Sequence, residues 1–78
     1  MTQIWVKELE DGSKAVGIFN LDNTNKEIVV TWSDLKMTPN QKVRDAWRQK
    51  DMGIYGNSYT VKVLPHDVAL FVTRPQKQ

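Results

Sequence analysis

The chain has 78 residues but no cysteine and a single histidine, His66. Without cysteine, neither a disulfide nor a cysteine-ligated zinc site can form. One histidine is too few for a histidine-based metal site, and we expect its ring, at a corner after Pro65, to bond a backbone group. Neither a Gly-x-Gly-x-x-Gly pattern nor a Walker pattern occurs. The sequence therefore predicts no metal, no cofactor and no catalytic residue.

A large excess of one charge and long apolar runs are also absent from the sequence. Eleven basic and nine acidic residues give a net charge of +2, and no run of like charge interrupts their mixture. This pattern is typical of an ordinary solvated surface rather than a nucleic-acid patch. No apolar stretch is long enough to cross a bilayer. We therefore expect neither nucleic acid nor a membrane as a partner.

Short runs of alternating or β-branched residues fill the chain from end to end, separated by turn residues. A run of this kind predicts a strand, and Asp, Asn and Gly between runs predict turns. The expected strands are 4–9, 14–20, 27–32, 42–47, 54–55, 59–63 and 68–73. We expect residues 1–78 to form one domain, an all-β, small antiparallel β-sandwich of about six to eight short strands.

Local patterns give more detailed expectations. Strand 14–20 is apolar at nearly every position, so both of its faces should be covered. In strand 59–63, Tyr59, Val61 and Val63 should point inward. A single helical turn at 33–35 should be capped by Ser33 or Asp34. Residues 48–53 read as a polar loop, and the tail after Arg74 is expected to be disordered.

Aromatic residues supply the bulk available for a core. Each buries roughly 150–250 Å², and a domain of this size needs that area. Core or interdomain contact is therefore the main reading. Two alternatives stay open: exposed aromatics that stack on sugars, or aromatics that hold single-stranded nucleic acid together with nearby Lys and Arg. The aromatic residues are Trp5, Phe19, Trp32, Trp47, Tyr55, Tyr59 and Phe71.

Carboxylates are numerous, but most fall in turns. Glycosidase chemistry needs two carboxylates that face each other about 5 to 9 Å apart across a pocket. The turn and cap positions of most aspartates do not favour that arrangement. Asp45 is the exception, because it lies in a predicted half-buried strand between Arg44 and Arg48. We expect it to form a buried ion pair with one of these two arginines.

Four segments taken together resemble a known domain. They are residues 11–20, 28–35, 43–53 and 64–71, which include Trp32-Ser33-Asp34-Leu35 and Val43-Arg44-Asp45-Ala46-Trp47. Their order and spacing resemble the C-terminal β-sandwich of family 27 glycoside hydrolases, the α-galactosidases (melibiases) and α-N-acetylgalactosaminidases. The resemblance extends over about residues 4–73.

This resemblance implies a parent enzyme with an N-terminal (β/α)8 barrel, which carries both catalytic aspartates of a retaining mechanism acting on terminal α-galactosides. The sandwich would pack on the flank of that barrel without being catalytic. The Lys-Tyr-Asp type of motif that holds the family's nucleophile does not occur in this chain. No catalytic position can therefore be transferred to it.

The sequence thus leads to one main hypothesis and one alternative. The main hypothesis is a non-catalytic accessory domain that covers and stabilises the catalytic barrel of the same parent chain. The alternative is an autonomous carbohydrate-binding module, in which a saccharide is the partner. The candidate interdomain or sugar-contact residues are Trp47, Arg48, Asp45 and Tyr55, and Gln49 and Asn57 are further candidates for bonding sugar hydroxyls.

Overall fold

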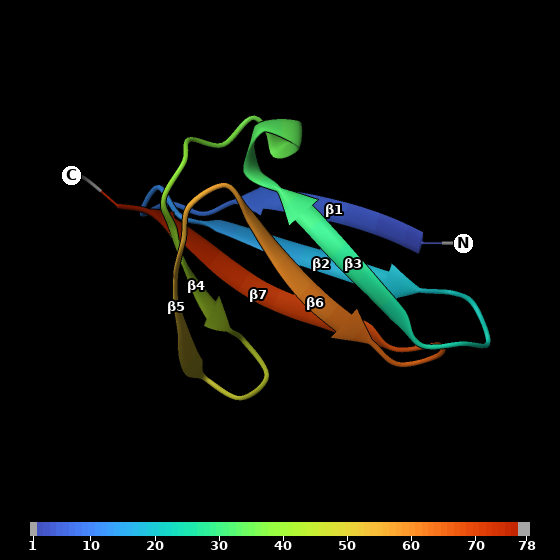
Figure 1. The fold of residues 1–78 in the computed structure, drawn as a ribbon. Helices are drawn as coiled ribbons and strands as arrows, with labels where there is room; N and C mark the ends of the chain where they lie inside the picture. Colours follow the sequence, from blue (N-terminus) through green and yellow to red (C-terminus); the bar gives the residue numbers. More distant parts are fainter. Residues whose placement is uncertain (1, 77–78) are drawn as a thin grey trace.

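The computed structural model describes residues 2–76, which form seven antiparallel strands and one 3₁₀ turn (Figure 1). This confirms the predicted small all-β sandwich. The strands are β1 (Thr2–Glu8), β2 (Lys14–Asn20), β3 (Lys26–Thr31), β4 (Gln41–Asp45), β5 (Lys50–Tyr55), β6 (Ser58–Val63) and β7 (Val68–Pro75), and the 3₁₀ turn η1 is Trp32–Leu35. No helix in this part of the chain is long and apolar enough to span a membrane.

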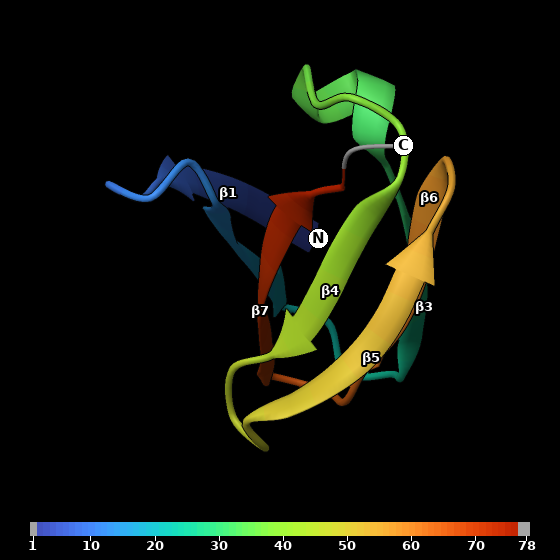
Figure 2. The same cartoon turned by 90° about the vertical axis from the view of Figure 1, so that its left-hand side faces the viewer.

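The strands form two unequal sheets. Five strands pair in the order β1-β2-β7-β4-β5, and β3 pairs only with β6. Figure 1 shows β3 and β6 crossing in front of β2 and β7, and the turned view in Figure 2 shows them on one side of the larger sheet. The larger sheet therefore has an inner face, covered by β3 and β6, and an outer face without a second layer.

The hydrophobic core lies between the two sheets. Alternate residues of β2, β4 and β7 meet side chains from β3, β6 and η1, as expected when every second residue of a strand points to the same face. Burying each large apolar side chain contributes about 1.5–3 kcal/mol. The buried residues are Val16, Ile18, Val30, Trp32, Met37, Val43, Tyr59, Val63 and Phe71.

Strand β6 confirms the predicted alternation, because Tyr59 and Val63 are buried and Val61 packs against the core. Strand β2 is covered on its core-facing side by β3 and β6, and on the outer side Trp5 covers Gly17. The central residues of β2 are buried in succession, and Phe19 on the outer face is half-buried. The strands with the clearest sequence signal are thus the ones that carry the core.

Trp32 shows where the expected helix cap was wrong. The turn begins at Trp32, and its N-cap is Thr31, which makes no side-chain capping bond. Trp32 is fully buried, and its indole Nε1 donates a hydrogen bond to the carbonyl of Tyr55 at 3.0 Å. Packing of this side chain sets the start of the turn, so a cap from Ser33 or Asp34 is not needed.

The boundaries of β4 and β5 also differ from the prediction. Strand β4 ends at Asp45 instead of residue 47, and β5 begins at Lys50 instead of residue 54. The loop between them is therefore only residues 46–49. Residues 50–53 were predicted to be a loop because of their polar side chains. Such side chains are equally compatible with β5, an edge strand with one side open to solvent. Arg44 and Asp51, which face each other in this pairing, form an ion pair at 2.9 Å.

The end of the chain is more ordered than predicted. Arg74 and Pro75 belong to β7, and the backbone N–H of Gln76 donates to the backbone carbonyl of Asn40 at 2.9 Å. Arg74 also pairs with the carboxylate of Asp11. The expected disorder is therefore wrong for residues 75 and 76, and the last two residues lie outside the described part.

A buried asparagine joins the loops at one end of the sandwich. Asn20 is fully buried, and its Nδ2 donates to the carbonyls of Thr24 at 2.8 Å, Val63 at 3.0 Å and Leu64 at 3.2 Å. At this end His66 contacts Oδ1 of Asn23. The prediction that the His66 ring bonds a backbone group is therefore wrong, because the two loops bring their side chains together.

Candidate functional site

The turn at residues 46–49 holds Trp47 out into solvent. Oδ1 of Asp45 accepts the backbone N–H groups of Trp47 at 2.9 Å and Arg48 at 3.0 Å, which ends β4 and shapes the turn. The amide of Ala46 donates to the carbonyl of Leu70 at 3.0 Å and ties the turn to β7. Trp47 is nevertheless 66% exposed. The backbone of the turn is thus held in place, while the large aromatic side chain that it carries stays largely exposed.

The expected buried ion pair of Asp45 is not found. Oδ2 of Asp45 lies 3.9 Å from Nε of Arg48, but the Arg48 side chain is exposed. Arg44 pairs with Asp51 instead. Since exposed pairs contribute only about 0–1 kcal/mol, the main role of Asp45 is to accept the two turn amides.

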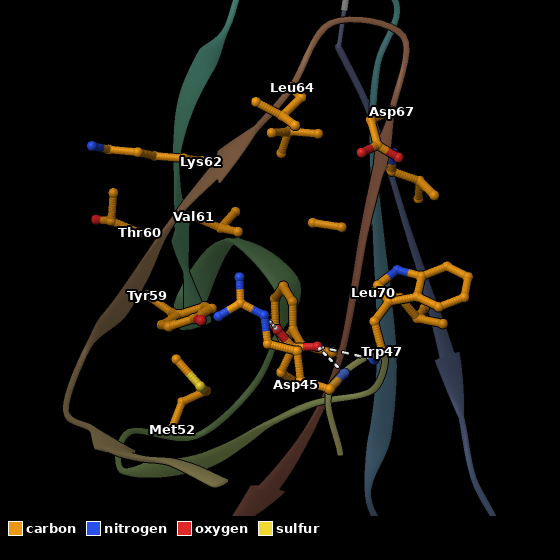
Figure 3. Close-up of a pocket in the computed structure, with 15 residues that line it drawn as sticks. Asp45, Trp47, Met52, Tyr59, Thr60, Val61, Lys62, Leu64, Asp67 and Leu70 are labelled. Carbon is orange, nitrogen blue, oxygen red and sulfur yellow. Dashed lines mark hydrogen bonds and ion pairs between the residues drawn. The ribbon is translucent and has the colours of Figure 1, made fainter. Parts of the chain in front are cut away.

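A groove of about 480 Å³ opens beside this turn. It forms because β4 pairs with β7 only from Phe71 onward, so the first residues of β7 lack a β4 neighbour. Strand β6 lies across the gap (Figure 3). The walls carry charged side chains among mostly apolar ones: Asp45, Trp47, Arg48, Met52, Tyr59, Thr60, Val61, Lys62, Val63, Leu64, Asp67, Val68, Ala69, Leu70 and Phe71.

Three of the four predicted site residues therefore meet at one place. Asp45, Trp47 and Arg48 all line the groove, and Tyr55 does not. The hydroxyl of Tyr55 donates to the carbonyl of Met52 at 3.1 Å, and its ring meets the Tyr59 ring edge-on at 4.7 Å. Tyr55 thus belongs to the packing that supports the groove. Gln49 and Asn57 are likewise absent from its walls.

Tyr59 forms part of the groove from below. Its ring packs edge-on against both Tyr55 and Phe71, with the Phe71 centroid at 5.1 Å. Burial raises the pKa of the Tyr59 hydroxyl, and the nearby Tyr55 and Asp45 raise it further. The phenol therefore stays neutral at physiological pH and acts as packing.

Sequence reasoning missed the opposite wall of the groove. Lys62, Leu64 and Asp67 lie there, on β6 and the corner before β7, and Leu70 of β7 lies next to Trp47. The polar alternation of β6 correctly placed Lys62 outside the core, but nothing in the sequence indicated that β7 would lie beside the turn at 46–49. That proximity results from the strand order.

Groups for metal or acid–base chemistry do not gather here. Across residues 2–76, no cluster of three or more His, Asp or Glu side chains could hold a metal ion. Every buried side-chain nitrogen and oxygen in the same residues has a hydrogen-bond partner. The groove is thus suited to contact with another molecule through an aromatic ring and mixed charges.

Comparison with known proteins decides which kind of domain this is. Residues 1–73 match the family described as the α-galactosidase C-terminal β-sandwich domain. The chain belongs to this family. The match confirms the resemblance seen in the sequence.

Two curated relatives are similar over almost the whole chain. A probable α-galactosidase of Dictyostelium discoideum is 33% identical over 79 residues, which span 96% of this chain and 20% of the relative. An isomalto-dextranase of Arthrobacter globiformis is 31% identical over 78 residues, which span 97% of this chain and 12% of the relative. The chain thus spans a fifth or less of these relatives.

Solved structures share the fold. A family 27 β-L-arabinopyranosidase from Geobacillus stearothermophilus superposes with a TM-score of 0.91 at 24% identity, covering 97% of this chain and 18% of that one. α-Galactosidase I from Mortierella vinacea gives a TM-score of 0.88 at 24% identity, covering 96% and 21%. In both cases the sandwich is one part of a much longer chain.

Proposed function

We propose that this domain packs on the catalytic barrel of an α-galactosidase-like parent enzyme and stabilises it. The observation that carries the proposal is Trp47, an exposed aromatic on a turn that two hydrogen bonds to Asp45 hold in place. Exposed aromatic residues are enriched at contact surfaces, and covering a tryptophan costs little side-chain entropy because it has only two χ angles. Trp47, Arg48 and Asp45 are the contact residues, and Tyr55 supports them from within.

The proposed parent hydrolyses terminal α-galactosides with retention. The domain family and the Dictyostelium relative support this substrate class. The isomalto-dextranase and the β-L-arabinopyranosidase carry similar domains beside other activities. That range agrees with a structural role for the sandwich, because a domain shared by enzymes with different substrates need not contact them.

A chimaera tests the structural role. The C-terminal domain of the Dictyostelium relative is replaced by this chain, and the same relative truncated before that domain serves as control. We expect the chimaera to be active and to unfold in one transition at a higher temperature than the truncated protein, as measured by calorimetry. If this chain instead unfolds in the chimaera at the temperature of the isolated chain, the proposal is wrong.

The groove supports one alternative, an autonomous carbohydrate-binding module. Its walls combine exposed Trp47 with four charged side chains, those of Asp45, Arg48, Lys62 and Asp67, and aromatic rings beside polar groups are the usual means of holding sugars. Titration with galactose or melibiose, followed by tryptophan fluorescence and amide chemical shifts, tests it. Spectra unchanged at tens of millimolar sugar would eliminate this alternative.

A further inference from the structure

The outer face of the five-stranded sheet carries a row of apolar side chains. In an antiparallel sheet, paired residues point to the same face. Trp5 of β1 pairs with Gly17 of β2, and Gly17 pairs with Leu70 of β7. Because Gly17 lies between Val16 and Ile18, which face the core, this row faces outward. Phe19 with Val68, and Ala15 with Val72, form the neighbouring rows.

Trp5 lies on Gly17 with one face of its indole. A Cβ atom built at Gly17 would lie 2.5 Å from Cε2 of Trp5, 2.6 Å from Nε1 and 2.8 Å from Cζ2. Cε2, the carbon shared by the two indole rings, is the nearest of these atoms to the Cβ position. If the indole met Gly17 with its edge, Nε1 and Cζ2 would be nearer than Cε2. Trp5 is 41% exposed, so part of its surface still faces solvent.

The row ends at a second exposed tryptophan. The hydrogen bond from Ala46 to Leu70 places the turn directly beyond Leu70, and Trp47 and Leu70 line the same groove (Figure 3). Two exposed indoles therefore stand on either side of Leu70. We name this set, Trp5, Leu70, Val72 and Trp47, the tryptophan face.

A basic rim borders the tryptophan face. Val72 pairs with Arg44, and Arg74 pairs with Lys42, so these cations share the outer face, as does Lys7 opposite Ala15. Asp51 lies 2.9 Å from Arg44 and 3.9 Å from Lys42, and Asp11 pairs with Arg74. Four cations and two carboxylates leave the rim with a positive charge.

We infer that the tryptophan face is the surface on which the catalytic part of the same parent chain docks, through an apolar surface bordered by acidic side chains. The inference rests on the proposed function and extends it from one turn to a whole sheet face. The acidic border follows from the basic rim, since opposite charges align docking surfaces.

Chain connectivity supports the same occupant. In a family of C-terminal domains, the rest of each chain comes before the sandwich, and this domain makes up only 18% and 21% of two of the solved chains. The preceding part would thus join next to β1, the edge strand that carries Trp5. Five strands about 4.8 Å apart make a face of roughly 500 Å². This face and an equal area on its partner together fall within the 600–1,500 Å² or so that an interdomain interface buries.

The test introduces Trp5→Ser and Trp47→Ser together, in the isolated chain and in the chimaera described above. Val29→Ser is the matched control, because Val29 is 58% exposed but lies on β3, which covers the opposite face. Melting temperatures are measured for all six proteins. We expect the double variant to lower the melting temperature of the chimaera by about 5 °C more than that of the isolated chain, and the control to show no such excess.

Each outcome leads to a decision. If the unsubstituted chimaera melts in one transition and the double variant behaves like the Val29→Ser control, the docking face and the Trp47 contact are both wrong, whereas the packing of this domain on the catalytic part still stands. If this chain melts independently in the unsubstituted chimaera, the proposed function fails and the inference fails with it. If galactose protects the isolated chain's tryptophans from quenching and the double variant loses this effect, the face binds sugar and the docking inference is overturned.

Discussion

The two faces of the five-stranded sheet are built from the same strands but have different surroundings. On the inner face, Val16, Ile18, Val43 and Phe71 are buried under β3 and β6. On the outer face, Trp5 lies on a glycine and remains partly exposed. Within residues 2–76, a second layer of strands lies over one face only. An apolar face that its own chain leaves uncovered identifies where another molecule is expected.

Replacing Trp32 tests the inner face and should have the largest effect. Trp32→Ala removes a fully buried indole and its bond to the carbonyl of Tyr55, so we expect a loss of about 3–5 kcal/mol in the free energy of unfolding. Urea unfolding followed by circular dichroism measures it. The matched change Trp47→Ala should cost the isolated chain less than about 1 kcal/mol. Equal losses would remove the distinction between covered and uncovered tryptophans.

Asn20 tests how the inner face is closed at the loop end. Asn20→Ala leaves the carbonyls of Thr24, Val63 and Leu64 without their Nδ2 donor, and the backbone amide of Asp22 without its Oδ1 acceptor at 3.0 Å. We expect a loss of roughly 2–3 kcal/mol, by the same urea measurement. Asn25→Ala, at an exposed position of the same loop, is the control. A similar loss for both would mean that the buried bonds do not hold this end together.

Gly17 tests the outer face. Gly17→Ala places a methyl group against the indole of Trp5, which must swing away, so we expect a loss of about 1–3 kcal/mol. Gly56→Ala is the control, because a Cβ there lies at an ordinary 3.8 Å from Asn40. Acrylamide quenching should show greater exposure of Trp5 in Gly17→Ala alone. Unchanged quenching would show that Trp5 does not rest on this glycine.

Replacing Asp11, which pairs with Arg74 of the basic rim, should change the stability of the chain least among these variants. Hydrogen bonds from the hydroxyl and amide of Ser13 lower the pKa of Asp11 below its ordinary 3.8, and Arg74 lowers it further. A carboxyl group whose pKa is lowered by folding stabilises the fold at pH values above its ordinary pKa. This stabilisation is lost as the pH falls through the lower pKa of the folded state. Wild type should therefore be more stable than Asp11→Asn at pH 6, with a smaller difference at pH 3, in urea midpoints. An equal difference at both values would contradict this assignment.

Much of the fold was predictable because strand alternation and turn residues act locally. The inward set of β6 and the covered core-facing side of β2 followed from residue pattern alone. Strand β5 was missed in part because a polar edge strand has the composition of a loop. The cap of η1 was misplaced because burial of Trp32, a long-range effect, set its start.

For the candidate site, the sequence pointed to Asp45, Trp47, Arg48 and Tyr55, of which the first three line one groove and Tyr55 packs beside it. The sequence does not show whether an aromatic side chain is buried or exposed. Only the tertiary structure could therefore separate the buried Trp32 from the exposed Trp47. The sequence by itself determined the β-sandwich class, the turns and, through the four segments, the family. The strand order decided the rest: it joined Trp5, Gly17 and Leu70 in one row on the outer face and brought the turn that carries Trp47 next to Leu70, because sheet pairing joins residues that lie far apart along the chain.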